Sequence, residues 1–129
     1  MRQMPWPVNH FHEHQHSTGG ILIIDFDPPK GEEYKVGSEI MKRRPAVVIS
    51  RDAINNVRRT VMVVPLSSSP QPVPVFAVPV PSAGPNSVAV CDQITTINKA
   101  TRMLRRIGSL SSEDLRLIER SVLDALALS

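Results

Sequence analysis

The chain has 129 residues, with 15 Lys or Arg against 12 Asp or Glu, and a formal net charge of +3. This length favours one domain with a sizeable core. The single cysteine, Cys91, excludes an intramolecular disulfide and is typical of a reducing compartment. No apolar run approaches the roughly 20 residues of a membrane span, and residues 1–19 lack the apolar core of a signal peptide. We therefore expect a cytoplasmic protein with no membrane partner.

The charges are unevenly distributed along the chain. Ten basic residues lie between Lys42 and Arg106, against only Asp52 and Asp92, whereas four acids face two arginines after Ser111. A basic body of this kind suits a polyanion such as nucleic acid. A solvated charged surface without a partner explains the same pattern, and both interpretations stay open at this point.

Residues 1–19 are predicted to be a flexible leader, and residues 20–129 a single domain. The leader contains prolines and ends at a pair of glycines, which are turn signals. It carries all four histidines, at alternate positions, where two or three could ligate a metal or where they simply form a tail with adventitious metal affinity. We favour the tail and expect no metal site and no cofactor. The histidines are His10, His12, His14 and His16.

The domain begins as a series of short β-branched runs bounded by turn residues, which is typical of strands. The run Val73–Val80, which contains two prolines, is at best an edge strand, because proline cannot donate to a ladder. A single helical turn is expected over residues 98–104. The predicted strands are Ile21–Phe26, Pro45–Ser50, Thr60–Ser67, Val73–Val80, Ser87–Ile97 and Arg105–Leu110.

The end of the chain is predicted to be an amphipathic helix. Ser111 with Asp114 has the spacing of a capping box. The apolar residues Leu115, Ile118, Val122 and Leu126 then recur on one helical face. Together with the strands, this predicts a mainly β fold with one helix: a small, SH3-like, curled antiparallel barrel closed by the C-terminal helix.

Arg44 and Ser67 are the first candidate site residues. Arg44 precedes a proline, so its backbone is biased to be extended at the mouth of a strand, and its guanidinium matches phosphate oxygens. Ser67 ends the third predicted strand with a hydroxyl. The two groups could hold a phosphate. Alternatively, Arg44 pairs with Asp25 or Asp27, and Ser67 caps a turn.

Asp92 is the third candidate, because it lies inside a strand-like run directly after Cys91. A carboxylate at this position is either a structural hydrogen-bond acceptor or a base near the reacting atoms. Cys91 itself is expected in the core.

Five segments together resemble the MazF/PemK family of toxin endoribonucleases. The resemblance covers about Gly20 to Leu128. It implies a homodimeric barrel that cleaves single-stranded RNA at short sequences and is inhibited by a cognate antitoxin protein. The segments are IIDFDPPKG, RRPAVVIS, VVPLS, VCDQITTIN and RIGSLSSEDL, and they occur in the order of the family.

The resemblance also implies roles for the candidate residues. Arg44 would stabilise charge on the phosphoryl oxygens, Ser67 would hold a nonbridging oxygen, and Asp92 would be the candidate base. RNA supplies its own nucleophile, the 2′-hydroxyl, so that the reaction would need no metal and would leave a 2′,3′-cyclic phosphate and a 5′-hydroxyl. Further substrate contacts are expected from Arg43, Ser68, Tyr34 and Thr95.

Two features depart from the family pattern. The loop before Arg43 is longer by about a half-dozen residues, at positions 33–41, and Val90 and Thr95 stand where some members carry a cation. These departures keep two alternatives open beside the ribonuclease. One is a nucleic-acid-binding barrel without catalysis, and the other is a toxin of the same fold that acts on a protein.

Overall fold

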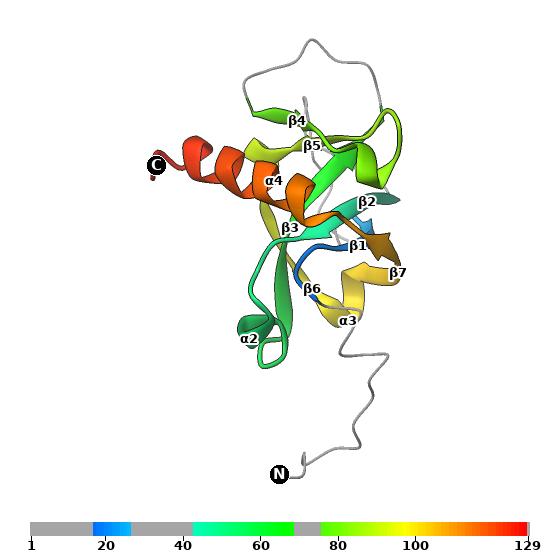
Figure 1. Cartoon of the computed structure of the whole chain (residues 1–129). Coiled ribbons are helices and arrows are strands. Elements are labelled where there is room, and N and C mark those ends of the chain that lie inside the picture. Colours follow the sequence, from blue (N-terminus) through cyan, green and yellow to red (C-terminus); the bar gives the residue numbers. More distant parts are fainter. Residues whose placement is uncertain (1–16, 27–42, 69–75, 129) are drawn as a thin grey trace.

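The computed structural model describes residues 17–26, 43–68 and 76–128 (Figure 1). Most of the predicted leader, the extended loop at 33–41 and Tyr34 lie outside the described residues. The described part is a mainly antiparallel sheet with a long C-terminal helix packed across it and short helical turns between strands.

The sheet contains seven strands in the order β4-β5-β3-β2-β1-β7, and β6 pairs with β3 beside β5. All pairs are antiparallel. The strands are β1 Gly20–Asp25, β2 Arg43–Val48, β3 Thr60–Ser67, β4 Ala77–Pro79, β5 Val88–Val90, β6 Thr95–Asn98 and β7 Met103–Ser109. The helices are α2 Asp52–Asn55, α3 Lys99–Arg102 and α4 Ser112–Ala125, with 3-10 turns η1 Pro81–Ala83 and η2 Cys91–Gln93.

Both faces of the sheet are apolar, which explains why its strands are nearly continuous hydrophobic runs. One face packs against α4 through a cluster that includes Ile21, Val47, Val64, Leu66, Ile118 and Val122. The other, which we call the concave face, carries Leu22, Ile24, Phe26, Ala46, Val48, Val61, Val63 and Ile97. Ile97 comes from β6 and Met103, packed on the same cluster, from β7, so the sheet curls around it.

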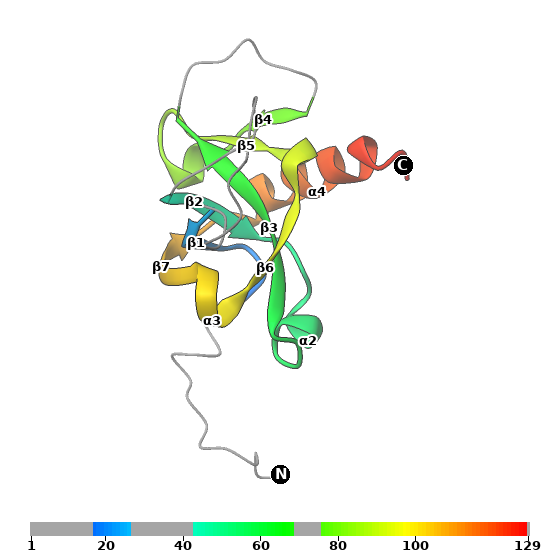
Figure 2. The same ribbon diagram turned by 180° about the vertical axis from the view of Figure 1, so that it is seen from behind.

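The predicted fold class is confirmed, but closure of the sheet into a barrel is not. Among the described strands, the hydrogen-bonded path runs from β4 at one edge to β7 at the other, so the sheet is open. The connection between β6 and β7 is made by the short helix α3, as Figure 2 shows from behind. β4, which covers Ala77–Pro79 of the predicted edge strand and includes one proline, is indeed at the edge.

The prediction of one strand over residues 87–97 is wrong. The turn η2 interrupts it. Ala89 is opposite Leu66, and Thr95 is opposite Val63. Five residues therefore separate Ala89 from Thr95, whereas only two separate Val63 from Leu66 on β3. Val63 is the last β3 residue paired with β6. By alternation, the next β3 backbone group facing this edge belongs to Pro65, which has no N–H to donate. The chain therefore leaves the ladder here.

A proline also ends the pairing of β2 with β3. The backbone N–H of Ile49 donates to Met62 O at 2.9 Å, so odd-numbered residues of this segment direct their backbone groups toward β3. Pro45 is such a residue and has no donor, and the β2–β3 register ends at Ala46 opposite Pro65. Pairing with β1 continues to Arg43, so β2 begins two residues before the predicted start.

The C-terminal helix is capped, although not by the predicted reciprocal box. The Ser111 hydroxyl accepts from Asp114 N at 3.1 Å, as expected of an N-cap. The Asp114 carboxylate turns to η1 instead and accepts from Ser82 N and Oγ at 2.9 and 2.6 Å. Ser82 Oγ in turn accepts from Ser111 N. Leu126 lies past the helix end and is 52% exposed, so its predicted place on the buried face is wrong.

The residues just before β1 are tied to the sheet. Gly19 adopts a positive φ of 86°, a conformation that favours glycine. Its N–H donates to Val48 O at 2.7 Å. Thr18 donates from its backbone to Asp52 Oδ1 at 2.7 Å and from its hydroxyl to Ser50 O at 2.6 Å. Among the described helices, none combines the length and apolar composition needed to cross a bilayer.

Candidate functional site

Arg44 and Ser67 lie at the same end of two neighbouring strands. Arg44 shares the alternation of Ala46 and Val48, and Ser67 that of Val61 and Val63, so both occupy the concave face. Continuing the β2–β3 register by two residues places Arg44 opposite Ser67. The structure thus brings together the two residues that were selected as a phosphate-binding pair.

Exposure differs among the four candidates at these strand ends. Arg44 is half-buried, whereas Ser67 is only 5% exposed and is held within β3. Arg43 and Ser68 are exposed and are each one residue away from the pair, so strand alternation directs them to the other face. Arg43 is paired with Asp25 in the β1–β2 register. The pair itself is therefore the more constrained part of the site.

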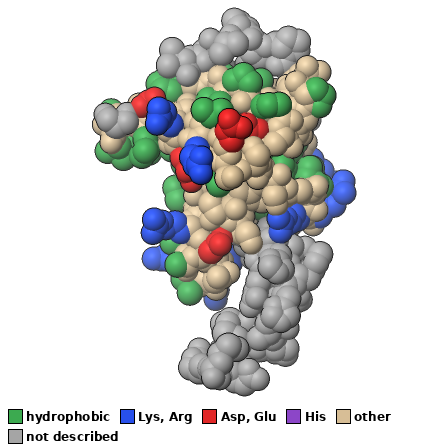
Figure 3. Space-filling view, in the orientation of Figure 1, with side chains coloured by type: hydrophobic (Ala, Val, Ile, Leu, Met, Phe, Trp, Pro, Cys, Tyr) green, Lys and Arg blue, Asp and Glu red, His purple; other side chains and the backbone are tan. Residues whose placement is uncertain are grey.

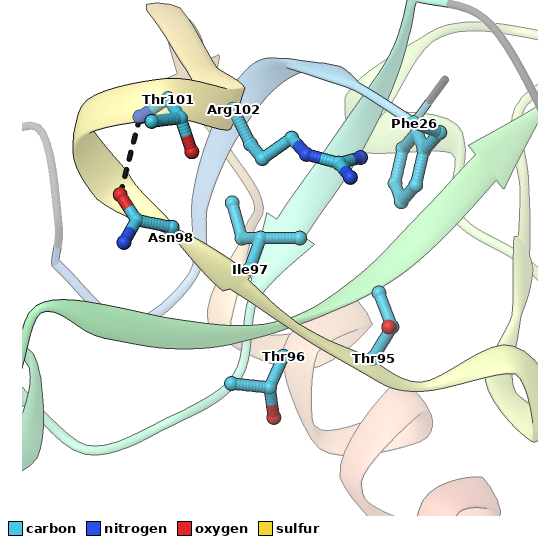
Figure 4. Close-up of a pocket in the computed structure, with 7 residues that line it drawn as sticks. All are labelled: Phe26, Thr95, Thr96, Ile97, Asn98, Thr101 and Arg102. Atoms are coloured by element: carbon cyan, nitrogen blue, oxygen red, sulfur yellow. Dashed lines mark hydrogen bonds between the residues drawn. The ribbon is translucent and has the colours of Figure 1, made fainter. Parts of the chain in front are cut away.

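A pocket of about 320 Å³ includes Phe26 and Ile97 of the concave face, on which Arg44 and Ser67 also lie. Phe26 forms one wall, and β6 with α3 forms the other (Figure 4). Phe26 follows Ile24 on the concave face, and Ile24 is paired with Arg44, so Phe26 lies just past the end of the strand next to Arg44. Its lining includes Thr95, Ile97, Asn98, Thr101 and Arg102.

Hydrogen bonds fix the polar side of the pocket. Arg102 Nη1 donates to Asp25 O at 3.0 Å, which holds its guanidinium toward Phe26. Asn98 Oδ1 accepts from Ala100 N at 2.8 Å and from Thr101 N at 3.2 Å, which caps α3. Of the predicted substrate contacts, Thr95 is therefore placed in a pocket. Tyr34 lies outside the described residues.

The Lys99 side chain attaches α3 to the end of α2. Its Nζ donates to the carbonyl oxygen of Asn55, whose side chain bonds with that of Ser50 and is fully buried. Burial lowers the pKa of the Lys99 ammonium. These contacts connect α3 to the segment between β2 and β3. The α3 wall of the pocket is thus held in place by hydrogen bonds among Lys99, Asn55 and Ser50.

Asp92 lies in η2, outside any strand, and is exposed. The neighbouring Cys91 is buried in the cluster beneath α4, which confirms its predicted place in the core. Burial raises the pKa of the Cys91 thiol, the Ser121 hydroxyl acts against this, and the Asp92 carboxylate adds to it. Asp92 is thus attached to the α4 side of the sheet, whereas Arg44 and Ser67 lie on the concave side.

Sequence reasoning did not predict that Phe26 and Arg102 line the same pocket. Their positions are 76 residues apart in the sequence, and only the Arg102–Asp25 bond shows that they meet. The excess of basic residues between Lys42 and Arg106 indicated only that this part of the chain carries positive charge. In Figure 3 basic groups gather alone near β7, whereas both signs mix around α4. Within the described residues, no three His, Cys, Asp or Glu side chains gather where they could share a metal ion.

Comparison with known proteins identifies the class to which this fold and site belong. The family described as PemK-like, MazF-like toxin of type II toxin-antitoxin system matches residues 17–126. The chain is also 32% identical, over 104 residues, to the endoribonuclease toxin MazF of Escherichia coli K12, covering 81% of this chain and 87% of that protein. The chain therefore belongs to the PemK-like, MazF-like toxin family, as its motifs predicted.

Solved structures show the same fold. MazF from Deinococcus radiodurans superposes with a TM-score of 0.71 at 21% identity, covering 88% of this chain and 97% of that one. The Mycobacterium tuberculosis toxin MazF-mt6 gives 0.65 at 23% identity, covering 85% and 98%. A MazE–MazF structure from D. radiodurans gives 0.68 at 23% identity, covering 88% and 97%.

Proposed function

We propose that this chain is a sequence-specific endoribonuclease toxin that cleaves single-stranded RNA in the cytoplasm. The observation that carries the proposal is the location of Arg44 and Ser67, at one end of adjacent strands and on the face that also carries Phe26 of the Phe26–Arg102 pocket. The relative from E. coli, 32% identical, is an endoribonuclease by name. The concave face thus combines groups suited to a phosphate with a pocket of the size of a small ligand.

In the proposed reaction, the 2′-oxygen attacks the adjacent phosphorus, and the bond from phosphorus to the 5′-oxygen breaks. Arg44 stabilises the charge that builds on the phosphoryl oxygens, because its donors are charged and fixed in a planar fork. The Ser67 hydroxyl donates to one nonbridging oxygen. The leaving 5′-oxygen takes up a proton from water, so the products are a 2′,3′-cyclic phosphate and a 5′-hydroxyl end.

Proton transfer requires a base that Arg44 cannot provide, since a guanidinium remains protonated in proteins. Asp92 is the proposed base for the 2′-hydroxyl. It is exposed in η2 and therefore accessible to RNA. Because it is attached to the α4 side of the sheet, it has to reach the scissile bond around the edge of β3 or from a second copy of the chain.

We propose further that the chain acts as a homodimer and is inhibited by a cognate antitoxin. MazF from D. radiodurans has been solved together with MazE, and an endoribonuclease from a mycobacterial species has been solved with its cognate antitoxin. Light scattering at micromolar concentration should give twice the 14.2 kDa mass of the chain. A monomeric mass would remove the dimer from the proposal.

The function is tested by incubating the purified chain with a long RNA of mixed sequence in EDTA and mapping the new ends. We expect cuts at a few short sequences, with 2′,3′-cyclic phosphate on one side and 5′-hydroxyl on the other. RNA that is bound but uncut would favour a binding protein without catalysis. RNA that is neither bound nor cut would favour a toxin that acts on a protein.

A further inference from the structure

We propose that the pocket between Phe26 and α3 binds a single nucleobase of the RNA and sets the base preference at one position of the cleaved sequence. This inference rests on the proposed function, since it assigns a base to a pocket on the same face as the proposed phosphate site. Phe26 of the pocket lies just past the end of the strand next to Arg44, through the Ile24–Arg44 pair. A nucleotide whose phosphate lies at Arg44 would thus carry its base toward Phe26.

The size and lining of the pocket fit a flat, partly apolar group. Its volume of about 320 Å³ is at the lower end of small-ligand pockets. Phe26 on one wall and Ile97 on the other are 3% and 5% exposed and make the lining partly apolar. Single-stranded RNA is commonly recognised through bases that are turned out into such sites.

The polar wall indicates which edge of a base the pocket would accept. Asn98 Oδ1 is already engaged by two backbone N–H groups, which leaves the amide N–H₂ as its available group. Arg102 offers donors only, and the hydroxyls of Thr95 and Thr101 are also available. No acidic residue is among the described residues of the lining. A donor-rich wall of this kind selects a base edge with acceptors, such as the O6 and N7 of guanine or a carbonyl of uracil.

The wall is also preorganised. Arg102 is held by its bond to Asp25 O, and α3 is held through Lys99 and Asn55. A guanidinium that is already positioned loses less conformational entropy on binding than a free side chain would. Arg102 is therefore the residue that we expect to discriminate most strongly between bases.

The test has a binding arm and a cleavage arm. In the first, guanosine 5′-monophosphate, uridine 5′-monophosphate and ribose 5-phosphate are titrated into the full chain, and the backbone amide signals of Thr95, Asn98 and Arg102 are followed by NMR. At least one nucleotide should shift these signals, and ribose 5-phosphate should not. Arg102→Met should weaken the binding of that nucleotide at least tenfold. Arg116→Met, which removes an exposed arginine of α4, should leave the binding unchanged.

In the second arm, end mapping compares the cut sites of the same proteins. Arg102→Met should still cut RNA but lose at least tenfold of its preference at one position. Thr95→Val keeps the side-chain shape and removes one hydroxyl, and it should reduce the same preference by a smaller factor. If Arg102→Met does not fold, as judged by circular dichroism, Thr95→Val and Arg102→Lys replace it.

The outcomes separate this inference from the proposed function. Equal shifts with ribose 5-phosphate would show an anion site and overturn the base assignment. RNA cleavage with an unchanged preference in both pocket variants would overturn it too, and would leave the ribonuclease in place. A chain that binds a nucleotide through Arg102 but does not cut RNA would retain the pocket and overturn the proposed function.

Discussion

Arg44, near the start of β2, and Ser67, at the end of β3, lie on the same face of the sheet and come opposite each other when the β2–β3 register is continued. The register ends two residues earlier, at Ala46 and Pro65, because Pro45 has no N–H to donate to β3. The pair therefore lies just beyond the last ladder position, at the end of the sheet from which the 27–42 segment leaves β1 and enters β2.

The first prediction concerns this pair. Removing one preorganised donor at a developing oxyanion typically costs about 10²–10³ in rate. Ser67→Ala should lie near the low end of this range and Arg44→Ala beyond its high end, because the guanidinium carries a full charge. Arg44→Lys should recover little, since an ammonium lacks the planar fork.

Rates are measured on one RNA with a mapped cut site, and Arg116→Ala serves as the matched control for loss of an arginine. If folded Arg44→Ala cleaves RNA at a near-normal rate, Arg44 is not the main partner of the phosphoryl charge.

The second prediction concerns Asp92. Since its side chain is exposed in η2, Asp92→Asn should change the free energy of unfolding by no more than about 0.5 kcal/mol. As the proposed base, however, it should lower cleavage by at least about 10². The two quantities are measured by urea titration and by single-turnover cleavage. A stable variant with unchanged cleavage would remove Asp92 from the mechanism, and a loss of stability would make it a structural acceptor.

The third prediction concerns where the domain begins. Deleting residues 1–16 keeps the bonds from Thr18 to Asp52 and Ser50, whereas deleting residues 1–18 removes them. Asp52 is exposed and Ser50 O keeps Asn55 Nδ2 as a donor, so the longer deletion should be less stable in urea by about 0.5–1.5 kcal/mol, the net contribution of a hydrogen bond. RNA cleavage should stay within a few-fold in both while they are folded. A folded but inactive 17–129 chain would assign the leader histidines to the mechanism.

The fourth prediction is a pH dependence from Cys91. Burial raises the pKa of its thiol, so the folded chain keeps the proton at a pH where the unfolded chain loses it. The contribution of the thiol to stability is therefore complete below about pH 8.5 and decreases as the pH rises further. Lys99 has the opposite sign, since a lowered pKa favours the folded chain as the pH rises.

Cys91→Ala isolates the thiol, because both proteins contain Lys99. In urea titrations from pH 7 to 10, the wild type should lose stability more steeply than Cys91→Ala, although Cys91→Ala starts lower because of the cavity it leaves. Parallel curves would contradict a protonated buried thiol.

The strands were predictable where a β-branched run has polar residues at both ends. The third predicted strand and β3 share the bounds Thr60–Ser67. The interruption at η2 was not predictable, because SVAVCDQITTI contains no Gly or Pro and is rich in β-branched residues. The cause lies in a different strand, at Pro65, and pairing partners are invisible in a single sequence. Leu126 was misplaced for a related reason: helical periodicity continues past Ala125, where the helix ends.

The site was predictable in part for the same reasons. Arg44 and Ser67 were found because each is adjacent to a local signal, a proline or a strand end. The pocket of Phe26 and Arg102 depends on the curl of the sheet, which brings the end of β1 to α3. No spacing in the sequence encodes that contact.

The most direct measurement uses one RNA in two forms, which differ only in the sugar just 5′ of a mapped cut. One form has a ribose there and the other a 2′-deoxyribose. In EDTA, the wild type should cut the ribose form, and Arg44→Ala should not. The deoxy form should bind to the wild type but remain intact. Cleavage that survives both the 2′-deoxy substitution and Arg44→Ala would mean a different nucleophile and a different site, and would contradict the proposed ribonuclease mechanism.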